Sequence, residues 1–270
     1  MTSTVDLGII VVTYNSAQTI GTCLGSAPEG VGELDYDIVV VDNASTDDTV
    51  DIASGFPRVR VVRNELNRGF AAACNQGIDL LAGRCRYILL LNPDAVASAG
   101  AFQALASYMD DHPLAGACGP LLVFPDGLAQ PFSFGQDPTL AYLLRRQFYH
   151  LVLRRYLHDW GANQIEEVDW ISGACMMLRP SALQQVGRLD EGMFLYFEDN
   201  DLCLRLRKAG WSVVRHPVAM VIHIGGQSVA NSPQARKEYY RNLERFYTRH
   251  YGLLARCFLR IMLPLYRRLG

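Results

Sequence analysis

The chain has 270 residues, of which 50% are hydrophobic and 19% charged, and its formal net charge is −2. This composition belongs to a folded protein with a full core and excludes a disordered or collagen-like chain. The charge is uneven, because residues 236–270 contain nine Lys or Arg against two Glu, which gives +7 there and −9 in the rest. A basic end on an acidic body suggests an anionic surface as its partner.

The seven cysteines are scattered and form no Cys-x-x-Cys pair. This spacing predicts buried, reduced thiols rather than disulfides or a zinc site. The sequence opens without a signal-peptide pattern, and no apolar run reaches the 18 or so residues of a spanning helix. We therefore expect a cytoplasmic protein.

Three strand-like runs open the chain, namely Leu7–Thr13, Tyr36–Val41 and Val59–Arg63. The first ends in a turn, Tyr14-Asn15-Ser16, that can start a helix through Leu24. The second ends at Asp42, which lies at the strand tip, where a nucleotide base can hydrogen-bond to it.

Polar turns follow the second and third strands. Ser45 or Thr46 is expected to cap the next helix, and Asp47 and Asp48 suit its positive end. The turn at Asn67–Phe70 leads into a small-residue helix over 71–81. Within that turn, Arg68 is either a solvated loop cation or a partner for a phosphate or a base.

The most informative strand is Tyr87–Asn92, an unbroken apolar run that suits a strand covered on both faces. Pro93 ends it and places Asn92 and Asp94 at its carboxyl end. Ligands of open α/β sheets bind at this end, where a carboxylate can hold a divalent metal on a nucleoside diphosphate. A simple Asn-Pro-Asp turn is the alternative.

A helix near 99–111 and a strand near 115–124 continue the alternation of strands and helices. This order predicts an α/β fold with a mostly parallel sheet flanked by helices. No Gly-x-Gly-x-x-Gly follows a strand and no Gly-x-x-x-x-Gly-Lys occurs. The absence of both motifs weakens a dinucleotide or P-loop interpretation.

The second half begins with Leu140–Trp160, which has helical apolar spacing interleaved with arginines. It predicts an amphipathic helix that packs on the core or faces a membrane. A strand over Val168–Leu178 follows, in which Gly173 leaves room for a ligand or a bulge. A short helix is expected over Pro180–Val186.

Carboxylates and a histidine mark the next two segments. An apolar, aromatic run leads into Glu198-Asp199-Asn200-Asp201 at the start of a helix closed by Gly210. Helix capping alone accounts for such carboxylates, but the lead-in would place Glu198 and Asp199 in a partly buried cleft where a carboxylate can act as a base. The strand over Val213–Ile224 ends at His223, which is either structural or part of a site.

The chain from Gln234 onward is expected to be helical, with possible breaks at Gly252 and Pro264. One stripe carries arginines and the other side is apolar; the arginines are Arg245, Arg249, Arg256, Arg260 and Arg267, and the apolar residues are Leu254, Phe258, Ile261 and Leu265. Such a helix either lies in an anionic membrane interface or packs on the domain with a solvated Arg face.

The ordered motifs resemble those of the family 2 inverting glycosyltransferases of the GT-A fold, in their bacterial rhamnosyltransferase-like branch. The matching text is Val-Val-Thr-Tyr-Asn at 11–15, Val-Val-Asp-Asn-Ala-Ser-Thr-Asp at 40–47, Asn-Arg-Gly-Phe-Ala-Ala-Ala-Cys-Asn at 67–75, Leu-Leu-Asn-Pro-Asp at 90–94, Ser-Gly-Ala-Cys-Met-Met at 172–177, Phe-Glu-Asp-Asn-Asp-Leu at 197–202 and His-Ile-Gly-Gly-Gln-Ser at 223–228. Each motif alone is weak, but the ordered set is specific.

The resemblance implies a single GT-A-type domain over residues 1–230 and a basic amphipathic helical tail over 231–270. Residues 1–125 would form the half that binds the nucleotide sugar, and residues 126–230 the half that binds the acceptor. The implied donor-binding residues are Thr13, Asn15, Asp42, Arg68, Asn92 and Asp94. The implied acceptor-binding residues are Trp170, Gly173 and Glu198.

The resemblance also assigns the chemistry. Asp199 matches the catalytic base, and Asp94 with His223 matches the ligands of a divalent metal, Mg²⁺ or Mn²⁺. Asn92 departs from the family pattern, which has an Asp there, so metal binding would rest on Asp94 and His223. The branch implies dTDP-L-rhamnose as the donor and a polyprenyl-diphosphate-linked glycan as the acceptor, in O-antigen or cell-wall assembly.

Several alternatives stay open at this point. A UDP-hexose or UDP-galactofuranose donor is the alternative to dTDP-L-rhamnose, since no residue decides the sugar. A sugar-nucleotide nucleotidyltransferase would have a Gly-rich phosphate-binding loop directly after the first strand, whereas this chain has Thr13-Tyr14-Asn15 there. A nucleotide- or glycan-binding module without turnover is a further possibility. The basic segments at 145–155 and 236–268 fit an anionic membrane surface at the inner face of the cytoplasmic membrane, whereas a nucleic-acid partner is not expected.

Overall fold

A nine-stranded mixed sheet forms the centre of the protein in the computed structural model, which describes residues 4–225 and 233–269. Its strand order is β3-β2-β1-β4-β10-β6-β11-β5, with β8 also paired to β11. The strands are β1 Val5–Thr13, β2 Tyr36–Asp42, β3 Val59–Arg63, β4 Cys85–Leu91, β5 Ala95–Ala97, β6 Ala115–Val123, β8 Glu166–Glu167, β10 Cys175–Leu178 and β11 Ser212–His223. A separate pair joins β7 Phe134–Gly135 to β9 Trp170–Ile171.

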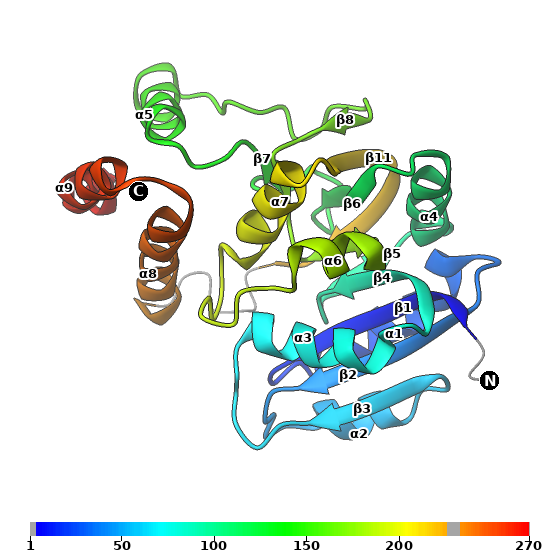
Figure 1. Ribbon diagram of the computed structural model, residues 1–270. Coiled ribbons are helices and arrows are strands. Elements are labelled where there is room, and N and C mark those ends of the chain that lie inside the picture. Colours follow the sequence, from blue (N-terminus) through cyan, green and yellow to red (C-terminus); the bar gives the residue numbers. More distant parts are fainter. Residues whose placement is uncertain (1–3, 226–232, 270) are drawn as a thin grey trace.

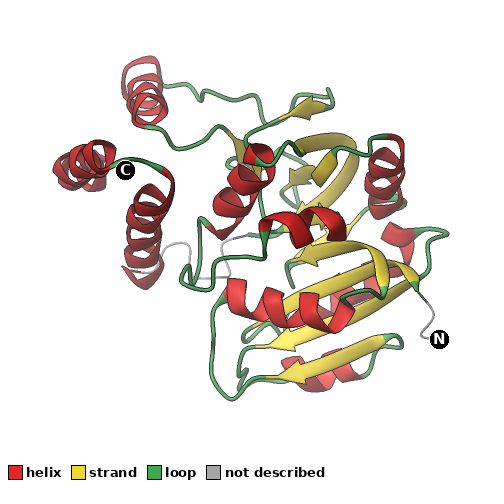
Figure 2. Ribbon diagram, viewed as in Figure 1, coloured by secondary structure: helices red, strands yellow, loops and turns green. Residues whose placement is uncertain are grey.

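Helices lie on both sides of this sheet (Figure 2). They are α1 Ile20–Val31, α2 Thr49–Ser54, α3 Phe70–Leu81, α4 Ala101–Asp111, α5 Leu140–Phe148, α6 Pro180–Val186, α7 Glu198–Lys208, α8 Pro233–His250 and α9 Leu253–Leu269. Small residues allow close packing, since a Cβ added at Gly77 of α3 would come within 2.6 Å of Ile10 on β1. The expected α/β class with a mostly parallel sheet is confirmed, because β1–β4 pair in parallel at the core.

Two local expectations were wrong, each for a tertiary reason. The strand expected over Val168–Leu178 is broken between β9 and β10, where the amides of Ser172 and Gly173 bond to Ser133 and Asp199 instead of to a strand. Ser45 and Thr46 do not cap a helix: Ser45 donates to Asp42, the amide of Thr46 donates to Asn15, and α2 begins only at Thr49.

The helix expected over Leu140–Trp160 is also shorter than the apolar spacing indicated. The α5 segment passes into a π-helical turn, η1 Tyr149–Leu153, which ends at Arg154 in a left-handed conformation with φ 49°. The chain then runs irregularly to Trp160, which is buried. This irregular segment matters below because it lines a cavity.

The C-terminal helices pack on the domain beside α5, away from β1–β3 (Figure 1). Leu243, Phe246 and Tyr247 of α8 are fully buried among apolar residues of α5, α7 and α9. Arg245 and Arg249 pair with Asp190. For α8, therefore, the alternative in which the helix packs on the domain is the one that the structure shows.

The chain breaks near Gly252 as anticipated but stays helical through Pro264. The side chains of Leu265 and Arg267 lie outside the described residues.

The outer face of α9 is different, because Leu254 and Ile261 are 87% and 74% exposed. Throughout the described ranges, no helix combines the length and the apolar character needed to cross a membrane.

Candidate active site

Asp42 is held by hydrogen bonds at the carboxyl end of β2. Thr13 on β1 lies directly opposite in the sheet register and donates through Oγ1 to Asp42 Oδ1 at 2.9 Å. The hydroxyl of Ser45 donates to the same oxygen, and its amide donates to Oδ2 at 3.0 Å. Asp42 is 1% exposed, so these contacts fix one orientation of its carboxylate.

Loops at the same sheet edge carry the other residues predicted for the nucleotide. Asn15 is exposed and accepts the Thr46 amide on Oδ1 at 2.9 Å, which ties the two loops together. Asn43, which sequence reasoning missed, accepts the Arg68 amide at 3.4 Å and donates to the Gly69 carbonyl at 3.2 Å. The Arg68 side chain is exposed at this edge.

Asp94 and His223 meet although 129 residues separate them in the chain. The antiparallel pairing of β5 with β11 places His223 opposite Ala95. His223 Nε2 lies 3.2 Å from Asp94 Oδ1 and 3.1 Å from the side-chain nitrogen Nδ2 of Asn92. Asp94 Oδ2 accepts the Gly225 amide at 3.1 Å. The turn residues 226–228 of the sequence motif lie outside the described residues.

The donor set at Asp94 and His223 fits a divalent cation. Asp94 Oδ1 is buried, and with His223 neutral it has no hydrogen-bond partner among the described residues. His223 Nδ1 lies 2.7 Å from Gln130 Oε1, which fixes Nδ1 as the donor and leaves a lone pair on Nε2. Ligands about 2.1 Å from a metal are roughly 3 Å apart at right angles, close to the observed Oδ1–Nε2 separation. Within the described residues, no three His, Cys, Asp or Glu side chains cluster as a metal site.

Burial raises the pKa of Asp94, but the hydrogen bond and charge that His223 provides when it is protonated at Nε2, together with the Gly225 amide, outweigh burial, so the pKa of this carboxyl is lowered. The carboxylate therefore stays ionised at neutral pH, as a metal ligand requires. Gln130 carries no signal in the sequence, because it lies in an irregular segment and reaches His223 only through the fold.

Glu198 and Asp199 begin α7 and differ in their surroundings. Asp199 is partly buried, and its two oxygens accept the amides of Gly173 at 3.2 Å and Asn200 at 2.8 Å. Glu198 is 5% exposed, and its Oε2 has no hydrogen-bond partner in the described part of the chain. The two carboxyl groups thus lie at the same helix start, but backbone amides donate hydrogen bonds to both oxygens of Asp199 and, among the described residues, none to Oε2 of Glu198.

Burial raises the pKa of Glu198 well above its usual range, and the charge of Asp199 raises it further. Burial also raises the pKa of Asp199, and the amides of Gly173 and Asn200 offset part of that rise. Glu198 is accordingly the neutral member of the pair. Asp199 carries the negative charge with a strengthened affinity for a proton, which suits a general base.

Backbone hydrogen bonds connect the segment that carries Asp199 to the turn that carries Asn92 and Asp94. The Asn92 amide donates to the Ala174 carbonyl at 2.9 Å, one residue beyond the Gly173 that bonds to Asp199. The Phe70 ring lies against Gly173, where an added Cβ would come within 3.2 Å of it. The structure thus brings Asp94, His223 and Asp199 to one region, next to the loop that carries Arg68.

Of the predicted acceptor residues, Trp170 is partly exposed on β9 and its indole donates to the Gln136 carbonyl at 3.1 Å. Gly173 adjoins Asp199 directly. Glu198 is more deeply buried than an acceptor contact requires, and its role stays a prediction.

Glu198→Gln is expected to raise the melting temperature by at least about 2 °C at pH 8 and by much less at pH 5. The pKa of Glu198 is higher in the folded protein than in the unfolded chain, where it is about 4.3. Its carboxyl therefore contributes stability at pH values below about 4.3, and this contribution is lost as the pH rises through the folded-state pKa. The neutral amide avoids that loss. Melting curves of both proteins from pH 5 to 8 measure it, and a constant difference would contradict a neutral Glu198.

A mixed, mostly parallel sheet with helices on both sides, and polar residues gathered at the ends of its strands, is the architecture of the GT-A fold. Solved structures of that fold class match this chain. A crystal structure of GalNAc-T7 with UDP, GalNAc and Mn²⁺ matches with TM-score 0.63 at 15% identity, over 91% of this chain and about half (48%) of that one. A mannosyltransferase from Pyrobaculum calidifontis with GDP-Man and Mn²⁺ matches with TM-score 0.59 at 19% identity, over 92% and 64%.

The particular family follows from sequence comparison. Residues 8–186 match the model of glycosyl transferase family 2, and the chain belongs to that family. It is also 34% identical, over 84% of its length and 78% of the relative's, to the N-acetylglucosaminyl-diphospho-decaprenol L-rhamnosyltransferase of Mycobacterium tuberculosis.

Proposed function

We propose that this protein is an inverting transferase that moves L-rhamnose from dTDP-L-rhamnose to a hydroxyl of a polyprenyl-diphosphate-linked glycan. The observation that supports the proposal is the backbone connection, through Gly173, Ala174 and Asn92, between the Asp94–His223 pair and Asp199, a partly buried carboxylate with a raised pKa. The name of the mycobacterial relative supports the sugar and the lipid class.

In this proposal the nucleotide lies along the loops at Thr13, Asn15, Asp42 and Arg68. Asn92 hydrogen-bonds to the ribose, while Asp94 and His223 hold a divalent metal, Mg²⁺ or Mn²⁺. When bound, the metal supplies positive charge to the diphosphate. Arg68 offsets further charge as the bond between the anomeric carbon and the diphosphate oxygen breaks.

The acceptor hydroxyl approaches the anomeric carbon from the face opposite the diphosphate. Asp199 takes the hydroxyl proton as the new carbon–oxygen bond forms, and displacement from that face inverts the anomeric centre. Gly173 orients the carboxylate through its amide, and Trp170 would pack against the acceptor sugar. Activity should therefore fall on acidification through the raised pKa of Asp199.

We further propose that α9 rests on the inner face of the cytoplasmic membrane. Its exposed Leu254, Phe258 and Ile261 would enter the interface while Arg260 meets anionic headgroups. Cosedimentation with anionic but not with neutral vesicles checks this placement.

A thermal-shift panel of nucleotide sugars tests the donor. With Mg²⁺ and a roughly 100-fold excess over Kd, we expect dTDP-L-rhamnose to raise the melting temperature by roughly 5–10 °C, more than UDP-glucose or UDP-galactofuranose does. A larger shift with a UDP-sugar would reassign the donor, and no shift with any of them would contradict nucleotide-sugar transfer.

A further inference from the structure

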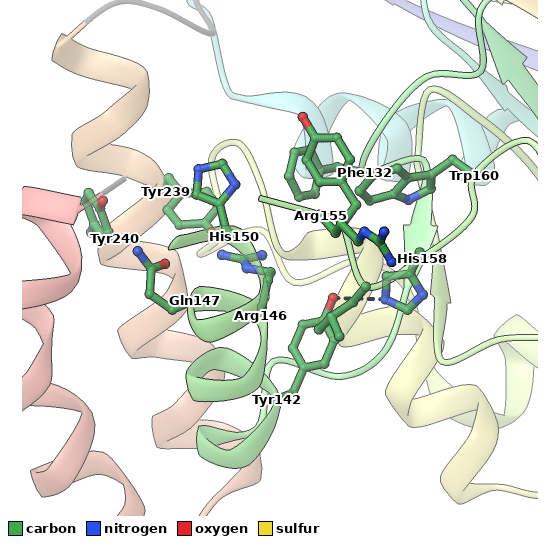
Figure 3. A pocket seen from close by; sticks show the side chains of 12 residues that line it. Phe132, Tyr142, Arg146, Gln147, His150, Arg155, His158, Trp160, Tyr239 and Tyr240 are labelled. Carbon is green, nitrogen blue, oxygen red and sulfur yellow. Dashed lines mark hydrogen bonds between the residues drawn. The ribbon is translucent and has the colours of Figure 1, made fainter. Parts of the chain in front are cut away.

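A cavity of about 330 Å³ lies between α5, the segment 155–160 and α8 (Figure 3). This volume falls within the roughly 300–1,000 Å³ of small-molecule sites. Its lining is aromatic and basic, and consists of Phe132, Tyr142, Arg146, Gln147, His150, Arg155, Tyr156, Leu157, His158, Trp160, Tyr239 and Tyr240. Neither Asp nor Glu is among these lining residues.

The lining suits an anionic group attached to an apolar chain. Arg146 and Arg155 provide guanidinium groups, which bind phosphate oxygens through paired hydrogen bonds. The ring centroids of Phe132 and Trp160 lie 5.2 Å apart with the planes tilted by 55°, and the edge-on ring of Tyr156 lies 4.8 Å from that of Trp160, so these three rings form one aromatic wall. Such a wall packs against a hydrocarbon such as an isoprene unit.

Two contacts connect the lining of the cavity to the segments around the proposed base. Phe132 precedes Ser133, whose carbonyl accepts the Ser172 amide at 2.9 Å, and the next residue, Gly173, bonds to Asp199. On the other side, the ring of Tyr239 lies 5.0 Å from that of Phe197, two residues before Asp199. The lining of the cavity is therefore connected to both segments that meet at Asp199.

An apolar strip extends from the cavity along η1. Phe148, Leu151, Val152 and Leu153 are about half exposed and adjoin the lining residues Gln147 and His150 in the chain. An exposed apolar strip of this kind marks an interaction site. It gives a long hydrocarbon a path from the cavity outward.

We propose that this cavity binds the diphosphate and the first isoprene units of the lipid-linked acceptor, an inference that rests on the proposed function. Arg146 and Arg155 contact the diphosphate, and the Phe132–Trp160 wall packs on the isoprene units. The diphosphate held here belongs to the acceptor lipid and not to the nucleotide donor.

The test is calorimetric titration with farnesyl diphosphate below its micellar concentration, in EDTA so that no metal can hold it elsewhere. We expect farnesyl diphosphate to bind more tightly than farnesol or dTDP under these conditions. Added dTDP should not displace it. Arg146→Gln with Arg155→Gln should weaken it at least about tenfold. The control pair Arg145→Gln with Arg154→Gln removes the same charge from neighbouring residues outside the lining and should leave binding unchanged.

Equal weakening by the two pairs, binding of farnesol as tight as that of the diphosphate, or displacement by dTDP would overturn the assignment. Because Arg146 also packs over Phe132 at 5.8 Å, the single Arg155→Gln variant serves as a second test, and it should weaken binding at least about threefold.

A transfer assay separates this inference from the proposed function. If farnesyl diphosphate binds as predicted but the wild-type protein transfers no sugar, the cavity assignment stands and the proposed function fails. If the Arg146/Arg155 variant transfers to a diphosphate-linked acceptor as fast as the wild type at subsaturating acceptor, the cavity assignment fails and the function stands.

Discussion

Asp199→Asn is expected to lower kcat by about 10²–10⁴, because an amide cannot accept the proton of the attacking hydroxyl. Donor affinity should change less than about threefold, since Asp94, His223 and the nucleotide loops are untouched. The Asn side chain still offers its one oxygen to the Gly173 amide, and of the two amides only that of Asn200, in the first turn of α7, loses its acceptor. Steady-state transfer together with calorimetric donor binding measures both quantities.

Glu198→Gln is the matched control for that experiment. Burial and the charge of Asp199 raise the pKa of the Glu198 carboxyl and favour its protonated form, so replacement by an amide should lower kcat less than about tenfold. Retained turnover in Asp199→Asn, or a greater loss in Glu198→Gln, would show that the wrong carboxyl was assigned as the base.

Asp94→Asn is expected to abolish the stimulation of donor binding by Mg²⁺ or Mn²⁺. The amide keeps an oxygen for the Gly225 amide but loses the charge that a divalent cation requires. The Kd for the nucleotide sugar with metal present should rise about 10- to 100-fold, measured by calorimetry with metal and with EDTA.

Asp111→Ala, which removes an exposed carboxylate at the end of α4, should leave the metal effect unchanged. His223→Ala should behave like Asp94→Asn. Metal stimulation that persists in both Asp94 and His223 variants would place the cation elsewhere.

Local sequence patterns predicted the elements that carry the site. Val59–Arg63 and Pro180–Val186 were anticipated at the residues where β3 and α6 occur, because apolar runs and an N-terminal Pro act over a few residues. Asp42 and Asp94 lie at strand ends for the same reason, since a parallel strand buried on both faces is apolar until it stops.

Contacts that depend on the fold were not predictable. Gln130 reaches His223 across 93 positions, and the break after β9 exists because Ser172 and Gly173 bond to partners elsewhere in the chain. Hydroxyls such as that of Ser45 suit a helix cap and a carboxylate partner alike, and only tertiary structure decides between them. The cavity beside α5 was missed because a continuous helix was expected over Leu140–Trp160, whereas the helical conformation ends at Arg154.

The stereochemistry of the product tests the account most directly. NMR of the anomeric centre, after incubation of the wild-type protein with dTDP-L-rhamnose, Mg²⁺ and a diphosphate-linked sugar acceptor, should show the configuration opposite to that of the donor. Asp199→Asn should form product at least about 100-fold more slowly. A product that retains the donor's configuration would contradict single displacement with Asp199 as the base.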